Sequence, residues 1–371
     1  MKNLSIDADI KKAHTLPSSF YTSDEIYNAS QDSIFARCWQ FIGDTDLIKI
    51  PGQVYPFTFI EGSIVEPLLL TRDQDDTIHC LSNVCTHRGT VLVENPDVCR
   101  LLQCRYHGRR FELNGQFKSM PEFEGVENFP SEEDNLKKVP FGLLDKLIFV
   151  SLNPIAPVDE FIGEMKSRLD WFPFDKLIFE PSRSRDYLVK ANWALYCENY
   201  LEGLHIPFVH PSLNAVLDYG NYTQEIYKYS NLQLAVAKPG EECFRLKETS
   251  PDYGSEIAAY YYWIFPNMMF NFYPWGLSIN IVKPLAKDLT KVSFLSYVLD
   301  SSKLDKGAGS GLDRVEREDE AIVEQVQKGM QSRFYSRGRY SPKREQGVHH
   351  FHRLLLDFLR LKIPTAESGE N

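Results

Sequence analysis

Two short segments combine a cysteine with a histidine and are the residues best suited to chemistry in this chain. Cys85 and His87 form the first pair, Cys104 and His107 form the second, and sixteen residues separate the two segments. One thiolate and one imidazole in each segment suit a [2Fe-2S] centre in which two cysteines hold one iron and two histidines hold the other. A structural zinc site more often takes its cysteines from one turn and its histidines from another. The order of the residues therefore favours an iron-sulfur cluster over zinc.

A second set of possible metal ligands lies in the segment from Glu198 to His210. The spacing predicts a helix over Trp193 to His205, on which Glu198, Glu202 and His205 share one face. Pro207 would interrupt this helix, so that His210 follows on a turn. Two neutral imidazoles held near one another suit Fe(II). Surface acids beside two hydrogen-bonded histidines would give the same pattern, and this segment alone leaves that alternative open.

A site with two histidines also needs a carboxylate, and the run from Glu316 to Glu320 offers four. Helical periodicity places Asp319 on a stripe with the apolar residues Val315, Ile322, Val323, Val326 and Met330. We therefore predict that Asp319 projects inward, while Glu318 and Glu320 flank it toward solvent. A buried carboxylate requires a partner, and a cation is the simplest one. The alternative for this run is a solvated, charged helix face.

The composition describes an acidic globular enzyme. The 371 residues suit two domains, and 43% of them are hydrophobic, which is ample for burial. A net charge of -10 leaves no basic surface for nucleic acid. Prolines and asparagines interrupt the aromatic stretch from Tyr260 to Leu277, which argues against a membrane-spanning helix. No secretory signal is recognisable and the remaining cysteines are scattered, so we expect reduced thiols and a cytoplasmic protein.

The pattern of apolar residues predicts an α+β chain in three parts. Residues 1–32 form an N-terminal segment that we expect to pack on the catalytic domain. Residues 33–153 carry short alternating strands, at 39–42, 54–60, 68–72, 78–84 and 147–152, and predict a small all-β domain. Residues 154–371 follow a proline-containing linker and predict an antiparallel sheet, with strands at 260–265, 268–273, 277–282 and 292–299. Helices predicted near 158–169, 193–205, 313–331 and 348–361 flank this sheet.

These motifs together resemble the α subunit of the Rieske non-haem iron oxygenases across essentially the full chain. The resemblance implies a Rieske [2Fe-2S] domain and a helix-grip, START-like catalytic domain. It makes Cys85, His87, Cys104 and His107 the cluster ligands, and it makes His205, His210 and Asp319 the ligands of a mononuclear Fe(II). In that family electrons pass from the cluster of one subunit to the iron site of its neighbour, which implies a homotrimer. Glu202 would be the bridging acid between the histidines, and Asn199 a second catalytic residue.

The bridging position is commonly aspartate in aromatic-ring dioxygenases, whereas this chain has Glu202. Together with Tyr340-Ser341-Pro342 and the run from Gly347 to His352, this glutamate resembles the branch of choline, carnitine and glycine betaine monooxygenases. That branch hydroxylates trimethylammonium compounds with O2. Aromatic faces stabilise such cations. Candidate residues for an aromatic cage are Tyr200, Phe208, Tyr262, Trp263, Phe265, Phe270, Phe272, Tyr273 and Trp275, most of which we expect to be ordinary core.

No Gly-x-Gly-x-x-Gly fingerprint occurs, so NAD(P)H would act only indirectly, through a separate flavin and iron-sulfur reductase. His349, His350 and His352 form a rival ligand cluster, which we interpret as structural or surface residues because no carboxylate is placed for them. Three alternatives remain at this point. One is an aromatic-ring-hydroxylating dioxygenase, which would share every metal ligand, and another is a Rieske electron-transfer protein, which would need only the first domain. The remotest is a zinc-stabilised interaction protein.

Overall fold

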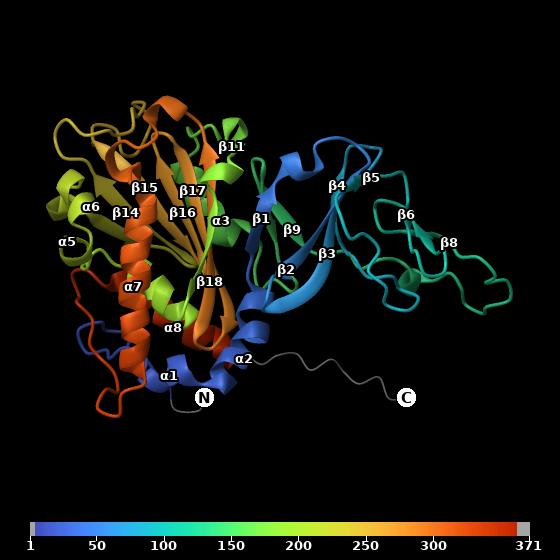
Figure 1. The fold of residues 1–371 in the computed structure, drawn as a ribbon, viewed down its shortest axis with the longest axis horizontal. Helices are drawn as coiled ribbons and strands as arrows, with labels where there is room; N and C mark the ends of the chain where they lie inside the picture. The colour runs from blue at the N-terminus through green and yellow to red at the C-terminus, as the bar shows by residue number, and fades with distance from the viewer. Residues whose placement is uncertain (1–3, 362–371) are drawn as a thin grey trace. The chain divides into compact units, whose positions relative to one another are not determined.

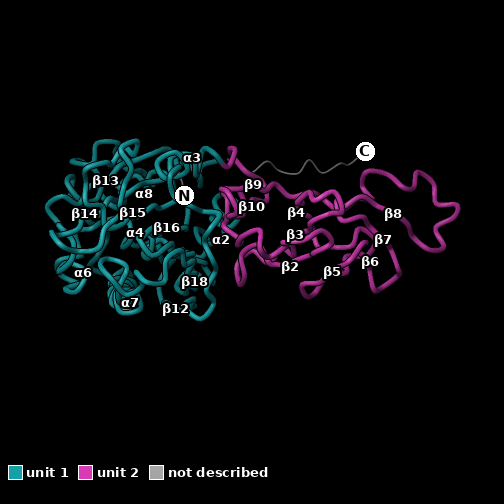
Figure 2. Tube along the Cα trace, turned by 90° about the horizontal axis from the view of Figure 1, so that it is seen from above, with its two compact units in different colours: residues 1–35, 159–371 teal, residues 36–158 magenta. Residues whose placement is uncertain are grey.

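The computed structural model describes residues 4–361 and divides the chain into two compact units (Figure 2). The smaller unit spans Ala36–Val158, and the larger unit joins the N-terminal residues through Phe35 to the chain from Asp159 onward. The sequence placed the corresponding divisions at residues 32/33 and 153/154. The N-terminal helices α1 (Ser18–Thr22) and α2 (Asp24–Ser33) belong to the larger unit. Helix α1 packs against α7 (Leu312–Met330).

The smaller unit is built from short strands, as the sequence predicts, and these strands pair antiparallel. One sheet has the order β4-β3-β2-β5 and two others have the orders β1-β10-β9 and β6-β7-β8. The strands are β1 (Gln40–Asp44), β2 (Gln53–Ile60), β3 (Ile64–Arg72), β4 (Ile78–Ser82), β5 (Asp97–Val98), β6 (Leu102–Gln103), β7 (Arg110–Phe111), β8 (Phe117–Ser119), β9 (Phe141–Leu144) and β10 (Leu147–Val150). The buried side chains of Leu69, Leu81 and Phe111 form part of a core that also includes Cys85 and Cys104.

The larger unit is built on one antiparallel sheet of eight strands, in the order β11-β18-β17-β16-β15-β14-β13, with β12 also paired to β18. Its strands are β11 (Ile178–Phe179), β12 (Arg185–Val189), β13 (Thr223–Ile226), β14 (Ser230–Val236), β15 (Ile257–Ile264), β16 (Met268–Tyr273), β17 (Gly276–Ala286) and β18 (Leu289–Val298). Its helices after α2 are α3 (Asp159–Arg168), α4 (Trp193–Tyr200), α5 (Ile206–Val209), α6 (Pro211–Val216), α7 (Leu312–Met330) and α8 (Gln346–Arg360). The combination of an all-β unit with this mixed unit confirms the predicted α+β class.

The two faces of this sheet differ in chemistry because successive residues of a strand point to opposite sides. On one side, Tyr260 and Phe272 pack with other aromatic rings, such as Trp171 and Phe172. On the other side the register aligns Gln233, Tyr261 and Asn271 across β14, β15 and β16. Helix α7 lies on the near side of the sheet in Figure 1, and it contacts α4 and β12. Buried amide side chains on a sheet face require hydrogen-bond partners, so this face is a candidate for a site.

Candidate functional site

The two cysteine-histidine segments form matching loops in the smaller unit. In the first loop, the N–H of Cys85 donates to the carbonyl of Thr90 and the N–H of Gly89 donates back to the carbonyl of Cys85. The second loop repeats both bonds with Cys104, Arg109 and Gly108, and the corresponding distances in the two loops are equal, at 2.8 and 3.0 Å. Gly89 and Gly108 have φ values of +70° and +74°, which favour glycine. The glycines therefore allow each loop to turn back on its cysteine.

The four predicted cluster ligands converge between these loops. Cys85 and Cys104 are each 2% exposed, and their thiols are within hydrogen-bond reach of each other. The rings of His87 and His107 have centroids 4.8 Å apart. The Nδ1 atoms of both histidines are buried and have no hydrogen-bond partner in the described part of the chain. Buried polar atoms are normally paired, so two orphaned imidazole nitrogens beside two buried thiols fit the donor set of a [2Fe-2S] centre.

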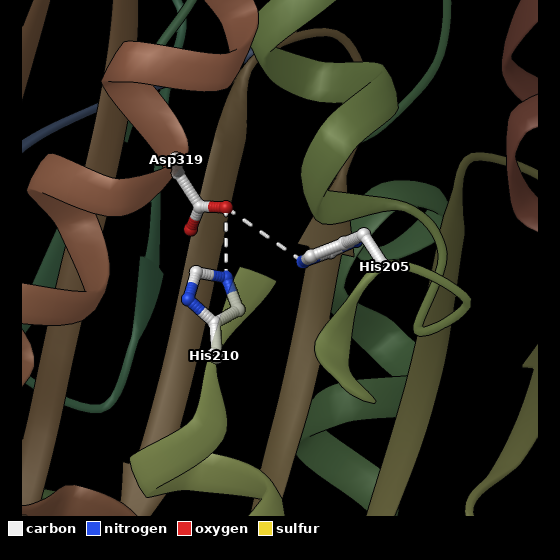
Figure 3. Close-up of side chains that lie close together, drawn as sticks. All are labelled: His205, His210 and Asp319. Carbon is white, nitrogen blue, oxygen red and sulfur yellow. Dashed lines mark hydrogen bonds and ion pairs between the residues drawn. The ribbon is translucent and has the colours of Figure 1, made fainter. Parts of the chain in front are cut away.

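A second convergence of ligand atoms lies in the larger unit. His205 precedes α5, His210 lies between α5 and α6, and Asp319 comes from α7 (Figure 3). Asp319 Oδ1 is 2.9 Å from His210 Nε2 and 3.7 Å from His205 Nε2. One ligand atom from each residue lies within 4.8 Å of the others, which is compact enough for one metal ion. Two imidazoles and one carboxylate are the donor set of non-haem Fe(II) sites.

Each histidine of this group is held from behind by a glutamate. His205 Nδ1 lies 2.6 Å from Glu202 Oε1, and His210 Nδ1 lies 2.8 Å from Glu318 Oε2. An Nδ1–H that donates to a carboxylate leaves Nε2 free to bind a metal. Burial lowers the pKa of His210, but its contacts with Asp319 and Glu318 outweigh burial and raise this pKa above its usual value. In the absence of a metal, the acids therefore favour a proton on His210, where a cation would otherwise bind.

The predicted helix over residues 193–205 is wrong in its last five residues. Helix α4 ends at Tyr200, and the capping residue Leu201 donates its N–H to the carbonyls of Cys197 and Glu198. The carboxylate of Glu202 then accepts the backbone N–H groups of Leu204 and His205. Because these side-chain bonds replace helical backbone bonds, the chain turns at Glu202, which therefore does not share a helix face with Glu198. Glu202 and His205 meet through this turn rather than through helical spacing.

Helix α7 confirms the helix predicted near residues 313–331. Its buried face, however, differs from the predicted apolar stripe that included Asp319. Ile322 and Val326 are 40% and 39% exposed, whereas Val323 and Gln327 are buried. Glu318, expected toward solvent, contacts His210 instead. Burial and the nearby Asp319 raise the pKa of Glu316 to about 8, despite hydrogen bonds with Tyr196 and Asn280. The sequence contained no signal that separated Glu316 and Glu318 from their acidic neighbours, because the register of α7 on the sheet depends on tertiary packing.

A cavity lies directly beside the histidines and Asp319. Its walls include Asn199, Glu202 and the three possible metal ligands. Five tyrosines also line it, namely Tyr196, Tyr200, Tyr222, Tyr261 and Tyr273. Of the nine aromatic residues considered for a cage, only Tyr200 and Tyr273 line this cavity, Phe208 is 81% exposed, and the strand residues Tyr262, Trp263, Phe270 and Phe272 are core. Tyr196 and Tyr261 were missed because the registers of α4 and β15 decide which rings face the cavity, and Tyr222 was missed because it lies in the turn before β13.

The three histidines of α8 do not form a metal site in the described structure. His349 Nε2 lies 2.7 Å from the carbonyl of Asp7. His352 is fully buried and lies between the Tyr340 hydroxyl, at 2.6 Å, and Glu198 Oε1, at 3.0 Å. His349 and His352 therefore have separate partners, whereas Nδ1 of His350 is buried without a hydrogen-bond partner in residues 4–361. None of the helices in residues 4–361 has the length and apolar composition needed to cross a membrane.

Comparisons with known proteins match a different family model to each unit. Residues 38–130 match the Rieske [2Fe-2S] domain, and residues 174–361 match the ring hydroxylating α subunit (catalytic domain). The chain is 33% identical to the chloroplastic choline monooxygenase of Arabidopsis thaliana, over 95% of this chain and 84% of that protein. It is 27% identical to the carnitine monooxygenase oxygenase subunit of Escherichia coli K12, over 96% of this chain and 98% of that protein.

Solved structures share the fold at lower identity. A quaternary ammonium Rieske monooxygenase in complex with L-carnitine superposes with a TM-score of 0.76 at 22% identity, covering 95% of this chain and 97% of the other. Naphthalene 1,2-dioxygenase from a Rhodococcus species gives a TM-score of 0.71 at 18% identity, covering 93% and 94%. Enzymes that act on quaternary ammonium compounds and on aromatic rings therefore share this architecture, and the fold alone does not identify the substrate.

Proposed function

Because this chain belongs to the family of Rieske ring-hydroxylating oxygenase α subunits, we propose that it is the terminal oxygenase of a multicomponent system that hydroxylates a quaternary ammonium compound. The substrate class would be choline, carnitine or betaine. One observation carries the proposal: two separate donor sets, one of thiols and imidazoles and one of imidazoles and a carboxylate, occur in one chain, and the second adjoins a tyrosine-lined cavity.

The residues that would hold the two groups follow from the donor atoms. Cys85, Cys104, His87 and His107 would hold the [2Fe-2S] cluster, the histidines through their orphaned Nδ1 atoms. His205, His210 and Asp319 would hold Fe(II). When bound, the cluster supplies electrons and the iron activates O2, so that one oxygen atom enters the substrate and the other leaves as water. Glu202 and Glu318 fix the tautomers of His205 and His210 and keep both Nε2 atoms directed toward Asp319.

The cavity supports the assignment of a cationic substrate. A trimethylammonium group has no N–H to donate, so it is recognised by aromatic faces and by negative charge. Five tyrosines provide the faces, and carboxylates lie in the same wall. Asn199 also lines the cavity, and we propose that it contacts the substrate and has a catalytic role there. The relatives named for choline and carnitine oxidation support the same substrate class.

The partners are also part of the proposal. Oxygenases of this family work with a reductase, and we propose one that carries flavin and an iron-sulfur centre and oxidises NAD(P)H. We further propose a homotrimer, in which Glu202 lies at the contact between the iron site of one subunit and the cluster of the next. A cytoplasmic location is proposed as well, since none of the seven cysteines, all within residues 4–361, forms a disulfide. Several relatives from plants are described as chloroplastic.

A substrate panel tests the proposed function. The purified chain, with a reductase and NADH, is supplied in turn with choline, L-carnitine, glycine betaine and naphthalene. We expect O2 uptake that depends on a trimethylammonium compound, with release of an aldehyde, formaldehyde or trimethylamine in step with NADH oxidation. An Asp319→Ala variant serves as control and should keep the visible absorption of the cluster without turnover. Dihydrodiol formation from naphthalene, with no reaction of the amines, would show a ring dioxygenase instead.

A further inference from the structure

Glu316 is the one carboxylate of the cavity wall that the proposed metal site does not use. The wall contains three acids, and of these Asp319 faces both imidazole Nε2 atoms and Glu202 binds His205 Nδ1. Glu316 lies one helical turn before Asp319 on α7 and makes no ion pair with a lysine or arginine among residues 4–361. Its raised pKa is the expected consequence of burying a carboxylate without a cation.

The hydrogen bonds around Glu316 leave it as an acceptor. The Tyr196 hydroxyl donates to Glu316 Oε2 at 2.8 Å. On the sheet, the Tyr200 hydroxyl donates to Asn271 Oδ1 at 2.7 Å, and Asn271 Nδ2 donates to Asn280 Oδ1 at 3.2 Å. The amide oxygen of Asn280 is thereby occupied, so its Nδ2 is the group that donates to Glu316. Donors reach the carboxylate from both α4 and the sheet, and they stabilise its charged form.

We infer that Glu316 is the counter-ion of the substrate's cationic head group, held in place by Tyr196 and Asn280 among the tyrosine rings. This inference rests on the proposed function and adds a specificity-determining residue to it. Tyrosine faces attract a cation but also accept a neutral group of the same shape, whereas a fixed carboxylate distinguishes the two. Because Glu316 and Asp319 are one helical turn apart, the cationic nitrogen would be held close to the proposed iron site, and the reacting carbon close to that nitrogen.

A matched pair of ligands tests the charge directly. In 3,3-dimethylbutan-1-ol a carbon atom replaces the quaternary nitrogen of choline. The two molecules therefore have similar shapes, but only choline is charged. Affinity is measured by titration calorimetry on the metal-loaded protein, and KM is measured with reductase present. We expect Glu316→Gln to weaken choline binding by about tenfold or more while the affinity for the neutral alcohol changes little. Glu324→Gln makes the same change on α7 away from the cavity wall and should alter neither affinity.

Each outcome decides the inference. Equal losses of affinity for choline and the alcohol would indicate a packing role and overturn it, as would an unchanged affinity for choline in a variant with full metal content. If Glu316→Gln does not fold, Glu316→Asp keeps the charge and should retain most of the preference for choline over the alcohol; loss of that preference in a folded Asp variant would also overturn the inference. Failure of the proposed function is distinguishable, because the unaltered chain would then bind no trimethylammonium compound.

Discussion

Residue-scale geometry explains how two histidines from an irregular segment can serve one metal ion. An imidazole offers either nitrogen, and its tautomer depends on the partner of the other nitrogen. His205 and His210 each have a glutamate at Nδ1, so both Nε2 atoms are directed to the same point beside Asp319. Glu202 comes from the same turn as His205, while Glu318 comes from α7, which also supplies Asp319. Helix α7 therefore provides one ligand and the support of another.

Substitution of Glu318 tests this support. We expect Glu318→Gln to lower the affinity for Fe(II) by about 10- to 100-fold, because the amide no longer holds the negative charge that orients and polarises His210. The cluster absorption should not change, since its ligands lie in the other unit. Iron is counted after dialysis at a series of free Fe(II) concentrations. Glu25→Gln, at an exposed position of α2, is the control, and an affinity equal in both variants would contradict the role of Glu318.

The ligand types and Glu202 could be predicted from the sequence, but Glu318, which supports His210, could not. Asp319 was selected through an apolar stripe that includes Ile322 and Val326, which are partly exposed in the structure. Asp319 nevertheless lies on the inward side of α7, close to His205 and His210. In the sequence, Glu316, Glu318 and Glu320 are glutamates in the same acidic run, with similar neighbours. Their different surroundings in the structure depend on where α4 and the histidine segment contact α7. The pattern of apolar residues within one helix carries no information about these contacts.

At the scale of elements, the start of α8 supports the turn that carries Glu202. The N–H of Gly347 donates to Gln224 Oε1 at 2.8 Å, and Gln224 Nε2 donates to the carbonyl of Leu201 at 2.9 Å. Leu201 is the capping residue of α4. A methyl group at Gly347 would lie 2.6 Å from that same carbonyl oxygen and 2.4 Å from Asn231 Nδ2. The glycine thus permits a close approach between α8 and the segment before His205.

Alanine substitutions at two helical glycines should change the stability of the protein in opposite directions. Gly347→Ala should destabilise the protein by about 1–3 kcal/mol, because a backbone oxygen and two amides must move to admit the methyl group. Gly163→Ala, in α3, adds a methyl group with no atom within 4 Å and should stabilise the protein by about 0.5–1 kcal/mol. Thermal unfolding of the two variants side by side measures both effects. Equal shifts of Tm in the same direction would contradict the packing argument.

Several helices and strands could be predicted from local sequence patterns alone. Helices α7 and α8 and strands β15 to β18 lie where the periodic apolar pattern predicts them. The end of α4 was missed because Glu202 bonds to backbone N–H groups downstream, which is a local competition that helical spacing ignores. Gly203, directly after Glu202, provided the available signal, since a glycine beside an acid often marks a turn.

For the whole molecule, the division into two units separates the two donor sets. Each set lies within one unit, and the cysteines and histidines of the first are part of that unit's own core and loops. This organisation could be predicted from the sequence because each unit has its own pattern, short alternating strands in one and longer strands with helices in the other. Loss of one metal site should therefore leave the other intact. The proposed trimer depends on how copies of the chain associate, and this cannot be predicted from a local sequence pattern.

The proposed trimer makes a prediction that two inactive variants can test together. A Cys104→Ser chain should lack the cluster, and an Asp319→Ala chain should lack the mononuclear iron, so neither is active alone. If electrons pass between neighbouring subunits of a ring, every mixed trimer contains one intact cluster facing one intact iron site, whichever variant is in excess. Co-expressed chains with different tags, purified through both tags, should then show about one third of the wild-type turnover with reductase present.

The matched control is an assembly of differently tagged Asp319→Ala chains, which should be inactive. Inactivity of the mixed assembly at full occupancy of the remaining sites would instead place the electron path within one chain, because each chain of the mixture lacks one of its two centres. Activity near one third would at the same time fix the ring geometry, because closed cyclic contacts create one productive junction in each mixed trimer whereas isolated pairs would give a different fraction.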